Sequence, residues 1–152
     1  MDEFFKVDPL QSGTKGIIFV GDMMLVCRRD DKTDHFPLKL DFPGGGSELN
    51  ESPFDTFKRE AMEEFGLKIK PSDIIYFRKY PSTLFPGKNT YFPVAKLPVT
   101  ERNNVTFGGE GTEWLLMSVQ EYLHNTDAVP FLAERTRDYL ENVKNQKLLK
   151  AQ

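Results

Sequence analysis

The pattern of apolar and polar positions along the chain predicts short strands, one central helix and one terminal helix. Gly21 and Asp22 separate the first two apolar runs, which is the spacing of a hairpin. The five segments expected to form strands are Lys15–Val20, Met23–Arg29, Asp73–Tyr80, Thr90–Leu97 and Thr112–Met117. Strands interrupted by one helix and completed by another indicate an α/β fold with a mixed sheet covered on both faces.

The central helix is expected over Pro53–Phe65. Ser52 can cap its first turn, Pro53 suits its first position, and Gly66 suits a left-handed stop. A helical wheel then separates an apolar side, which we expect to pack on the sheet, from an arc of carboxylates. The apolar side comprises Phe54, Phe57, Ala61 and Phe65, and the arc comprises Glu60, Glu63 and Glu64.

The terminal helix is expected over Pro130–Leu149, where side chains suited to one buried face recur at helical spacing. These side chains are Leu132, Thr136, Tyr139, Leu140 and Val143. Such a stripe usually packs on the core of its own chain. It would also support a homodimer.

Length and composition describe an ordinary soluble globular protein. The 152 residues suit one domain spanning residues 1–152. Apolar residues make up 39% and charged residues 28%, as in typical globular domains. A formal net charge of −3 provides no basic field for non-specific nucleic-acid binding, so we expect no duplex nucleic acid as a partner.

The compartment is indicated by the cysteine content and by the first residues. Cys27 is the single cysteine, which excludes an intrachain disulfide and indicates a reducing compartment. The stretch Met1–Gly13 has no long apolar run, so neither a secretory signal nor a membrane span is predicted there. We therefore expect a cytoplasmic protein without a membrane partner. His35 and His124 lie in polar surroundings and are expected at the surface.

The carboxylate arc needs an explanation, because like charges three and four residues apart on a helix repel. If the arc faces water, each pair costs only a few tenths of a kcal/mol, and the arc is then simply a solvated face. The other interpretation is a site for a divalent cation, since ions such as Mg²⁺ take oxygen ligands. The glycines at 44–46 would let the backbone approach both ions and a phosphate. Arg59 can orient Glu63 or Glu51.

The spacing of these residues resembles a complete Nudix box, the defining motif of the Nudix hydrolases. The segment runs from Gly45 to Leu67, and its charged and glycine positions are Gly45, Glu51, Arg59, Glu60, Glu63, Glu64 and Gly66. Ala61 stands where a larger aliphatic residue is common, which concerns packing more than chemistry. Outside the box the resemblance is weaker, and it extends to the preceding "FPGG" and to the loop that leads to Trp114.

The resemblance implies a Nudix-type α/β/α sandwich with a mixed β-sheet. It also implies Mg²⁺- or Mn²⁺-dependent hydrolysis of a nucleoside diphosphate linked to another group, a small-molecule nucleotide substrate. Residue by residue, it implies that metal is bound by Glu60, Glu63, Glu64 and the carbonyl of Gly44. Arg59 and Glu51 would pair to hold the loop to the helix, and Gly45 and Gly66 would be structural positions of the box.

The general base stays open at this point. Members of the family often add a carboxylate from a later loop, and "GGEGTEW" offers Glu110 first and Glu113 second. The catalytic candidates are therefore Glu63, Glu110 and Arg59. A carboxylate among them would take a proton from a metal-activated water that attacks phosphorus.

The substrate is less well indicated. Arg28 and Arg29 end a strand and point to opposite faces, so that one can bind a phosphate while the other is solvated. The aromatic residues available to stack on a base are Phe42, Tyr80, Phe85 and Tyr91. The segment "YPSTLFPGKNTYF" lies where related enzymes carry markers of substrate class, and it favours ADP-ribose-like or dinucleoside polyphosphate substrates. The alternatives are nucleoside triphosphates, capped RNA, and a non-catalytic module that binds nucleotides or RNA ends.

Overall fold

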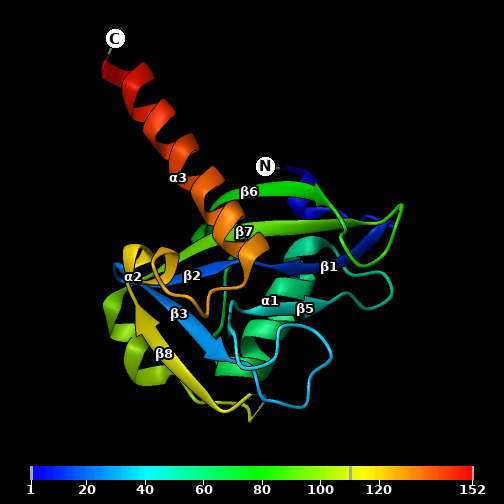
Figure 1. Cartoon of the computed structure of the whole chain (residues 1–152). Helices are drawn as coiled ribbons and strands as arrows, with labels where there is room; N and C mark the ends of the chain where they lie inside the picture. The colour runs from blue at the N-terminus through cyan, green and yellow to red at the C-terminus, as the bar shows by residue number, and fades with distance from the viewer. Residues whose placement is uncertain (1, 110, 152) are drawn as a thin grey trace.

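A mixed sheet of eight strands forms the centre of the computed structural model, which describes residues 2–109 and 111–151 (Figure 1). The strands are β1 (Gln11–Lys15), β2 (Ile17–Val20), β3 (Met23–Arg28), β4 (Leu40–Asp41), β5 (Gly44–Gly46), β6 (Ile74–Pro81), β7 (Asn89–Leu97) and β8 (Glu113–Met117). The helices are α1 (Pro53–Phe65), α2 (Val119–Leu123) and α3 (Pro130–Ala151), with 3₁₀ turns at Asp2–Phe5, Pro71–Asp73 and Val99–Asn104.

Strand β7 organises the sheet. It runs parallel to β1 and β2 and antiparallel to β6, and the order along the sheet is β4-β3-β2-β7-β1-β5. The remaining strand, β8, pairs with β3. The predicted hairpin is confirmed, because β2 and β3 are antiparallel and Gly21 between them adopts a φ of +64°.

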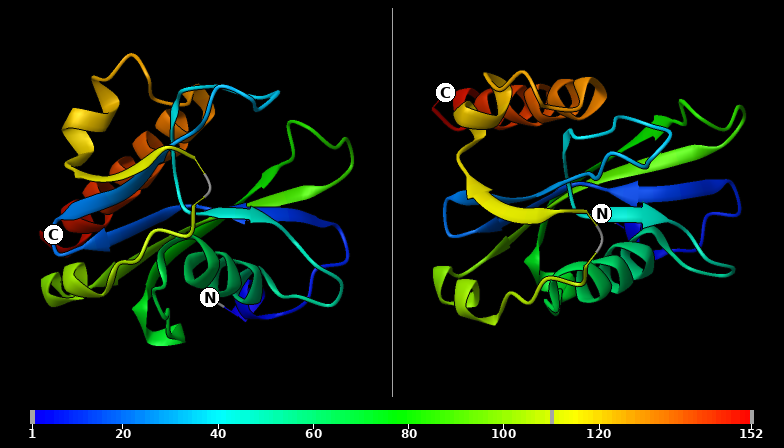
Figure 2. Two further views of the ribbon diagram at one scale, coloured as in Figure 1. Left: turned by 90° about the horizontal axis from the view of Figure 1, so that it is seen from below. Right: turned by 60° about the horizontal axis from the view of Figure 1, so that its bottom comes forward.

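The sheet is covered on both faces, and the predicted α/β/α arrangement is confirmed. Figure 2 shows α1 on one side of the sheet and α3 on the other. Neighbouring residues of β2 point to opposite sides, so that Ile18 packs in the core beneath α1 and Ile17 in the core beneath α3. The predicted apolar side of α1 is buried. On the other face of the sheet, Leu132 and Tyr139 of α3 pack in the same core as Ile17.

Helix α1 has the predicted bounds because its ends are specified locally. The side chain of Ser52 accepts a hydrogen bond from the amide of Asp55 at 3.0 Å, and the Asp55 carboxylate accepts one from the amide of Ser52 at 3.0 Å. At the other end Gly66 has a φ of +65° and donates its amide to Met62.

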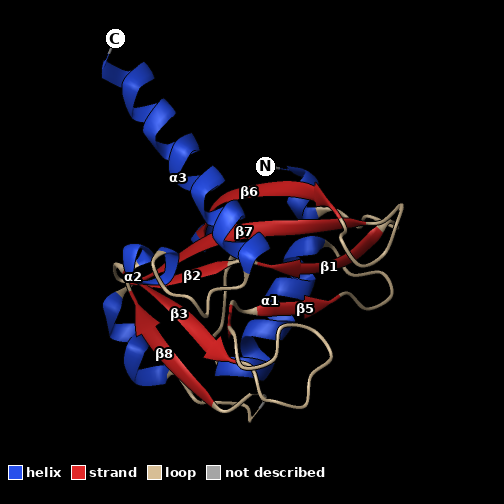
Figure 3. Ribbon diagram, viewed as in Figure 1, coloured by secondary structure: helices blue, strands red, loops and turns tan. Residues whose placement is uncertain are grey.

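Four elements were not predicted, β1, β4, β5 and α2. The sequence of β1, "QSGTK", is polar and lacks the alternation of a half-buried strand, yet Gln11 and Thr14 are buried and hydrogen-bonded to each other. The glycines at 44–46 form the short strand β5, which pairs with β1 in antiparallel orientation. Figure 3 shows α3 extending beyond the edge of the sheet. Across the described parts of the chain, no helix has the combination of length and apolarity needed to cross a membrane.

Candidate active site

Strand β5 lies across the carboxylate arc of α1 and fixes two of its members. The amide of Gly44 donates a hydrogen bond to Oε1 of Glu64 at 2.9 Å. A Cβ atom at position 45 would lie 2.7 Å from Oε1 of Glu60, which is closer than side chains tolerate. The glycines therefore allow the backbone of β5 to touch both glutamates, which places the first and second halves of the box in contact.

Arg59 joins the loop before α1 to the carboxylate arc. Its Nε and Nη2 donate to the two carboxylate oxygens of Glu51 at 2.7 and 3.0 Å. Its Nη1 donates to Glu60 at 2.9 Å and to Glu63 at 3.3 Å, and Nη2 also reaches the carbonyl of Gly46 at 2.8 Å. This bidentate hydrogen bond from Arg59 is the main reason why the pKa of Glu51 falls to about 2, and the reverse effect raises the pKa of Arg59.

The three glutamates differ in environment. The side chain of Glu60 is 14% exposed and that of Glu63 is 57% exposed, whereas Glu64 turns inward to Gly44. Burial raises the pKa of Glu64 to about 8, and the negative charges of Glu60 and Asp41 act in the same direction. The hydrogen bond from Gly44 and the charge of Lys15 oppose this shift without cancelling it. A positive ion beside Glu64 would therefore stabilise its ionised form.

The donor atoms in this region suit a divalent metal ion. No three acidic or metal-binding side chains among residues 2–109 and 111–151 converge as a ready ligand cluster, because Arg59 draws Glu60 and Glu63 toward itself. The available ligands are nevertheless carboxylate and carbonyl oxygens, the type that Mg²⁺ and Mn²⁺ prefer. Glu60 and Glu64 both adjoin the backbone of β5, where the Gly44 carbonyl belongs to the same short strand.

A second group of charges, centred on Asp41, lies beside the box. Asp41 Oδ2 accepts a hydrogen bond from Lys15 Nζ at 2.7 Å and another from Arg29 Nη1 at 2.6 Å. Arg29 is held further by Thr33 at 2.7 Å and by the carbonyl of His35 at 3.0 Å. A hollow of about 370 Å³ extends from this group to Glu64. Sequence reasoning missed Lys15 and Asp41, because they are 26 residues apart and neither belongs to the box.

Arg28 does not join the Asp41 group, because successive side chains along a strand point to opposite faces of the sheet. It donates to Glu113 at 3.1 Å, to the carbonyl of Leu38 at 2.9 Å and to Asp127 at 3.0 Å. It lines neither the hollow near Glu64 nor the apolar cavity beside it, whereas Arg29 lines both. Of the two predicted phosphate-binding arginines, only Arg29 is therefore brought to the box.

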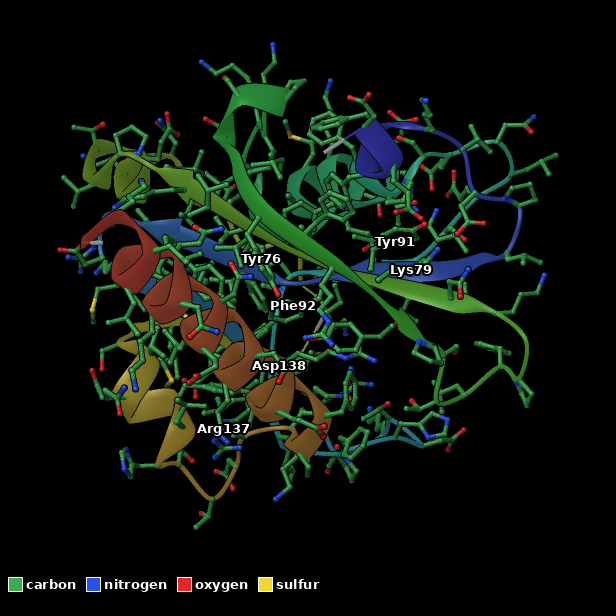
Figure 4. The ribbon with its side chains drawn as sticks, turned by 90° about the horizontal axis from the view of Figure 1, so that it is seen from above. Tyr76, Lys79, Tyr91, Phe92, Arg137 and Asp138 are labelled. Atoms are coloured by element: carbon green, nitrogen blue, oxygen red, sulfur yellow. The ribbon has the colours of Figure 1, made fainter. Side chains whose placement is uncertain are left out.

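Tyr91 is not brought to the box either. It is 1% exposed and packs among Phe4 and Phe77 in the core beneath α1, where its hydroxyl donates to Asp8 at 2.8 Å. Figure 4 shows Tyr91 and its neighbour Phe92 on opposite sides of the sheet. Burial and this hydrogen bond occupy Tyr91 fully, so it offers no face to a ligand.

The candidate bases outside the box are placed only in part. Glu110 lies outside the described residues, although Gly109 and Gly111 line the hollow next to Glu64. Glu113 begins β8 and is engaged by Arg28. The loop before Glu110 is anchored to α1, because the amide of Gly108 donates to the carbonyl of Glu64 at 2.8 Å.

The apolar cavity, of about 250 Å³, opens between the box and α3. Its floor includes Gly45 and Gly46, and two loops supply walls, the one between β3 and β4 and the one between β6 and β7 (Figure 3). Its apolar walls are Phe36, Leu84, Phe85, Val129 and Phe131. Of the predicted stacking residues Phe85 lines it, whereas Phe42 is buried and the Tyr80 hydroxyl is bonded to Asp138. His35, predicted at the surface, is exposed and also lines this cavity.

Comparisons with known proteins agree with this arrangement. Residues 9–139 match the family model of the NUDIX domain, and no curated protein matches the chain. A MutT protein from Methanosarcina mazei Go1 is 22% identical and superposes with a TM-score of 0.68 over 87% of this chain and 94% of that chain.

Two further solved structures share the fold. An Ap4A hydrolase from C. elegans is 15% identical, with a TM-score of 0.65 over 88% of this chain and 98% of that chain. A mutT/nudix family protein from Listeria innocua is 18% identical, with a TM-score of 0.67 over 94% and 99%. The family model, the shared fold and the contact between the two halves of the box lead to one conclusion: the chain belongs to the Nudix hydrolases, which act on phosphoric anhydride bonds.

Proposed function

We propose that the protein is a Mg²⁺- or Mn²⁺-dependent pyrophosphohydrolase that cleaves a nucleoside diphosphate linked to another moiety. ADP-ribose-like and dinucleoside polyphosphate substrates are favoured within this class. The observation that carries the proposal is the junction of β5 and α1, where Gly44 and Gly45 touch Glu64 and Glu60 beside the hollow that Arg29 lines. The resemblance to an Ap4A hydrolase supports the polyphosphate class.

Glu60, Glu63, Glu64 and the carbonyl of Gly44 would hold the metal. A divalent ion bound there would neutralise charge on the phosphate oxygens and lower the pKa of a bound water. Glu64 is suited to the inner position because it is shielded from water and fixed by Gly44. Glu60 is shielded as well, which limits the directions in which its carboxylate can turn.

Arg59 acts as a positioning residue. Its bidentate bond to Glu51 fixes the guanidinium, and the remaining Nη1 donor orients Glu60 and Glu63. Glu63 is more exposed than Glu60, and within residues 2–109 and 111–151 its carboxylate is held only by Arg59, at 3.3 Å. It is therefore free to turn and accept a proton from the attacking water. Glu110 is the alternative base from the loop that faces the hollow.

Arg29 is the group proposed to bind phosphate. Its guanidinium is anchored by Asp41 and Thr33, so that it is oriented before a ligand arrives. Lys15 shares the same Asp41 oxygen atom and adds a second positive charge. Together they place two cations opposite Asp41 and next to the carboxylates, which suits a chain of phosphates that spans both groups.

The setting proposed for this activity is the cytoplasm, in keeping with the single cysteine. The partner is a small nucleotide, and neither duplex nucleic acid nor a membrane takes part. A homodimer through the terminal helix belongs to the same proposal. Sedimentation equilibrium tests it, since a mass of 17.5 kDa at all concentrations would exclude self-association.

The decisive experiment is a product assay. ADP-ribose, dinucleoside polyphosphates, nucleoside triphosphates and capped RNA are incubated with the protein and Mg²⁺, Mn²⁺ or a chelator, and the products are separated by chromatography. We expect cleavage of one of the first two classes that disappears with chelator. Glu63→Gln or Glu64→Gln should reduce kcat by at least about a hundredfold while leaving the far-ultraviolet circular dichroism unchanged.

Glu141→Gln is the matched control, because Glu141 is an exposed glutamate on α3 away from the box. It should hydrolyse the same substrate at the wild-type rate. Binding of nucleotides without any product would replace the enzyme with a nucleotide-binding module. Cleavage of only the triphosphates or capped RNA would instead identify the alternative substrate classes.

A further inference from the structure

Arg135 of α3 is a buried cation in the wall of the apolar cavity. It is 6% exposed, and its guanidinium carbon lies 4.4 Å from the ring centroid of Tyr80 and 4.9 Å from that of Phe131. Contact with the two aromatic rings stabilises the charge through cation–π interactions. A cation–π contact uses none of the in-plane hydrogen-bonding positions of a guanidinium, so the N–H groups are left for other partners.

Those N–H groups have no partner in the described parts of the chain, where Arg135 makes neither a hydrogen bond nor an ion pair. Glu134 and Asp138 are the acidic residues of α3 whose charges act on Arg135. Glu134 is exposed, and the Asp138 carboxylate accepts a hydrogen bond from the Tyr80 hydroxyl at 2.8 Å and faces Arg78 at 3.7 Å. Burial lowers the pKa of Arg135, and the surrounding charges do not reverse that shift. No fully buried side-chain nitrogen or oxygen among the described residues lacks a partner, so the N–H groups of Arg135 open onto the cavity that this residue lines.

The lining of the cavity indicates which kind of ligand would suit the N–H groups of Arg135. One end adjoins Gly45 and Gly46 of the box, and the cations at that end, Lys15 and Arg29, are already bonded to Asp41. Arg135 lies against the ring of Phe131, which in turn packs on Phe36, and both phenylalanines line the cavity. Phe85 adds a third aromatic ring to the lining. Such walls suit a flat heterocycle, whereas a phosphate would lose its hydration there without gaining enough polar contacts.

We infer that Arg135 is a specificity-determining residue that binds the edge of the substrate's nucleobase through two neighbouring acceptors. This inference rests on the proposed function, which places the phosphates at the box and thereby the base in the cavity. Guanine offers such a pair in O6 and N7, and cytosine offers one in O2 and N3. Adenine sets an amino donor beside N7, which a guanidinium with only donors cannot match. Uracil alternates carbonyl acceptors with an N–H donor.

The expected preference is therefore guanine and cytosine over adenine and uracil. Within the proposed substrate class, this favours guanosine-containing compounds over their adenosine counterparts.

Equilibrium binding of GMP, AMP, CMP and UMP tests this inference. These monophosphates contain no phosphoric anhydride bond, and with chelator present no turnover enters the measurement. We expect GMP to bind at least about tenfold more tightly than AMP, as expected for one bidentate guanidinium contact. Arg135→Met, which keeps the length of the side chain, should bring the GMP and AMP affinities to within about twofold of each other.

Arg137→Met is the matched control. Arg137 lies two residues further along α3, is exposed, and sits on the side of the helix away from Asp138 (Figure 4). This variant should retain the wild-type preference for GMP. Arg135→Lys keeps the positive charge but cannot donate two parallel hydrogen bonds, so it should lose most of the preference for GMP. It serves as the test if Arg135→Met does not fold. An unchanged GMP preference in both Arg135 variants would overturn the inference.

Two further outcomes separate the possible ligands. If the Arg135 variants weaken all four monophosphates and inorganic phosphate equally, Arg135 binds phosphate and the nucleobase assignment is wrong. Hydrolysis of guanosine- and adenosine-containing dinucleoside tetraphosphates with Mg²⁺ provides the second measurement. Cleavage without any difference between the bases contradicts only the role of Arg135. A base preference in binding, without cleavage of any substrate, contradicts only the proposed enzyme.

Discussion

At the scale of single residues, Arg59 decides how the carboxylates of the box are arranged. It makes five hydrogen bonds that reach Glu51, Glu60, Glu63 and the carbonyl of Gly46. Two of these go to Glu51, whose side chain is only 14% exposed. The box thus contains an internal ion pair, Arg59 with Glu51, that orients the glutamates proposed to bind metal, and we expect this pair to affect stability.

Glu51→Gln should lower the free energy of unfolding by about 2 kcal/mol at pH 7, since the Arg59 guanidinium holds the pKa of Glu51 near 2. A carboxylate whose pKa is lower in the folded state contributes stability above its unfolded pKa. That contribution is lost as the pH falls through the folded pKa. The difference between wild type and variant, measured by urea denaturation, should therefore be constant above about pH 5 and shrink toward pH 2. A difference independent of pH would show that packing, not charge, is responsible.

At the scale of elements, the crossing of β5 over α1 explains why the box begins with glycines. At position 45 an added Cβ would meet the end of a flexible side chain, Glu60. At position 44 it would lie 2.2 Å from the backbone carbonyl of Thr14, and the φ of Gly44 is +135°. Two adjacent glycines are therefore required for different reasons, one for the carboxylate and one for the fold.

Gly45→Ala should displace Glu60 while leaving the fold intact, because Glu60 can turn away. We expect metal affinity, measured by titration calorimetry with Mn²⁺, to fall about tenfold or more while the melting temperature changes by only a few degrees.

Gly44→Ala should instead destabilise the protein by more than about 2 kcal/mol, since neither the backbone of β1 nor the positive φ can adapt. Thermal melts of the two variants side by side make the comparison. Equal losses of stability would mean that β5 and Glu60 do not contact each other as described.

At the scale of the whole molecule, the two helical layers have separate tasks. The face covered by α1 carries the carboxylates, whereas the face covered by α3 carries the cavity with Arg135 (Figure 2). Arg29 and Asp41 lie where the two regions meet, since both line the hollow near Glu64 and the apolar cavity. A nucleotide that spans them would have its phosphates and its base recognised by different layers of the sandwich.

Divalent metal should raise the melting temperature of the full chain, because an ion that binds only the folded state stabilises it by mass action. At a hundred times the dissociation constant the gain is about 2.7 kcal/mol, or several degrees for a protein of this size. Differential scanning calorimetry with Mg²⁺ and Mn²⁺ checks this, and Glu64→Gln should abolish the rise. No shift with either ion in the wild type would favour the interpretation of the arc as a solvated face.

The sequence by itself determined the features that depend on neighbours along the chain. Ser52, Pro53 and Gly66 specify the ends of α1 through contacts within a few residues, and the spacing of the box alone placed Glu51 and Arg59 for pairing. The hairpin of β2 and β3 follows from a turn of two residues. Such local interactions can be inferred from order and spacing because little of the chain takes part in them.

Only the tertiary structure decided the remainder of the site. Lys15 and Asp41 meet from β1 and β4, which are not adjacent in the sheet, and Arg135 reaches the cavity from the last helix. Tyr91 has an aromatic ring of the kind that can stack on a base, yet it projects from β7 into the core beneath α1 and is buried there. The polar strand β1 forms because β5 and β7 pair with its backbone on both sides. Contacts of this kind depend on which distant segments become neighbours, and no local pattern records that.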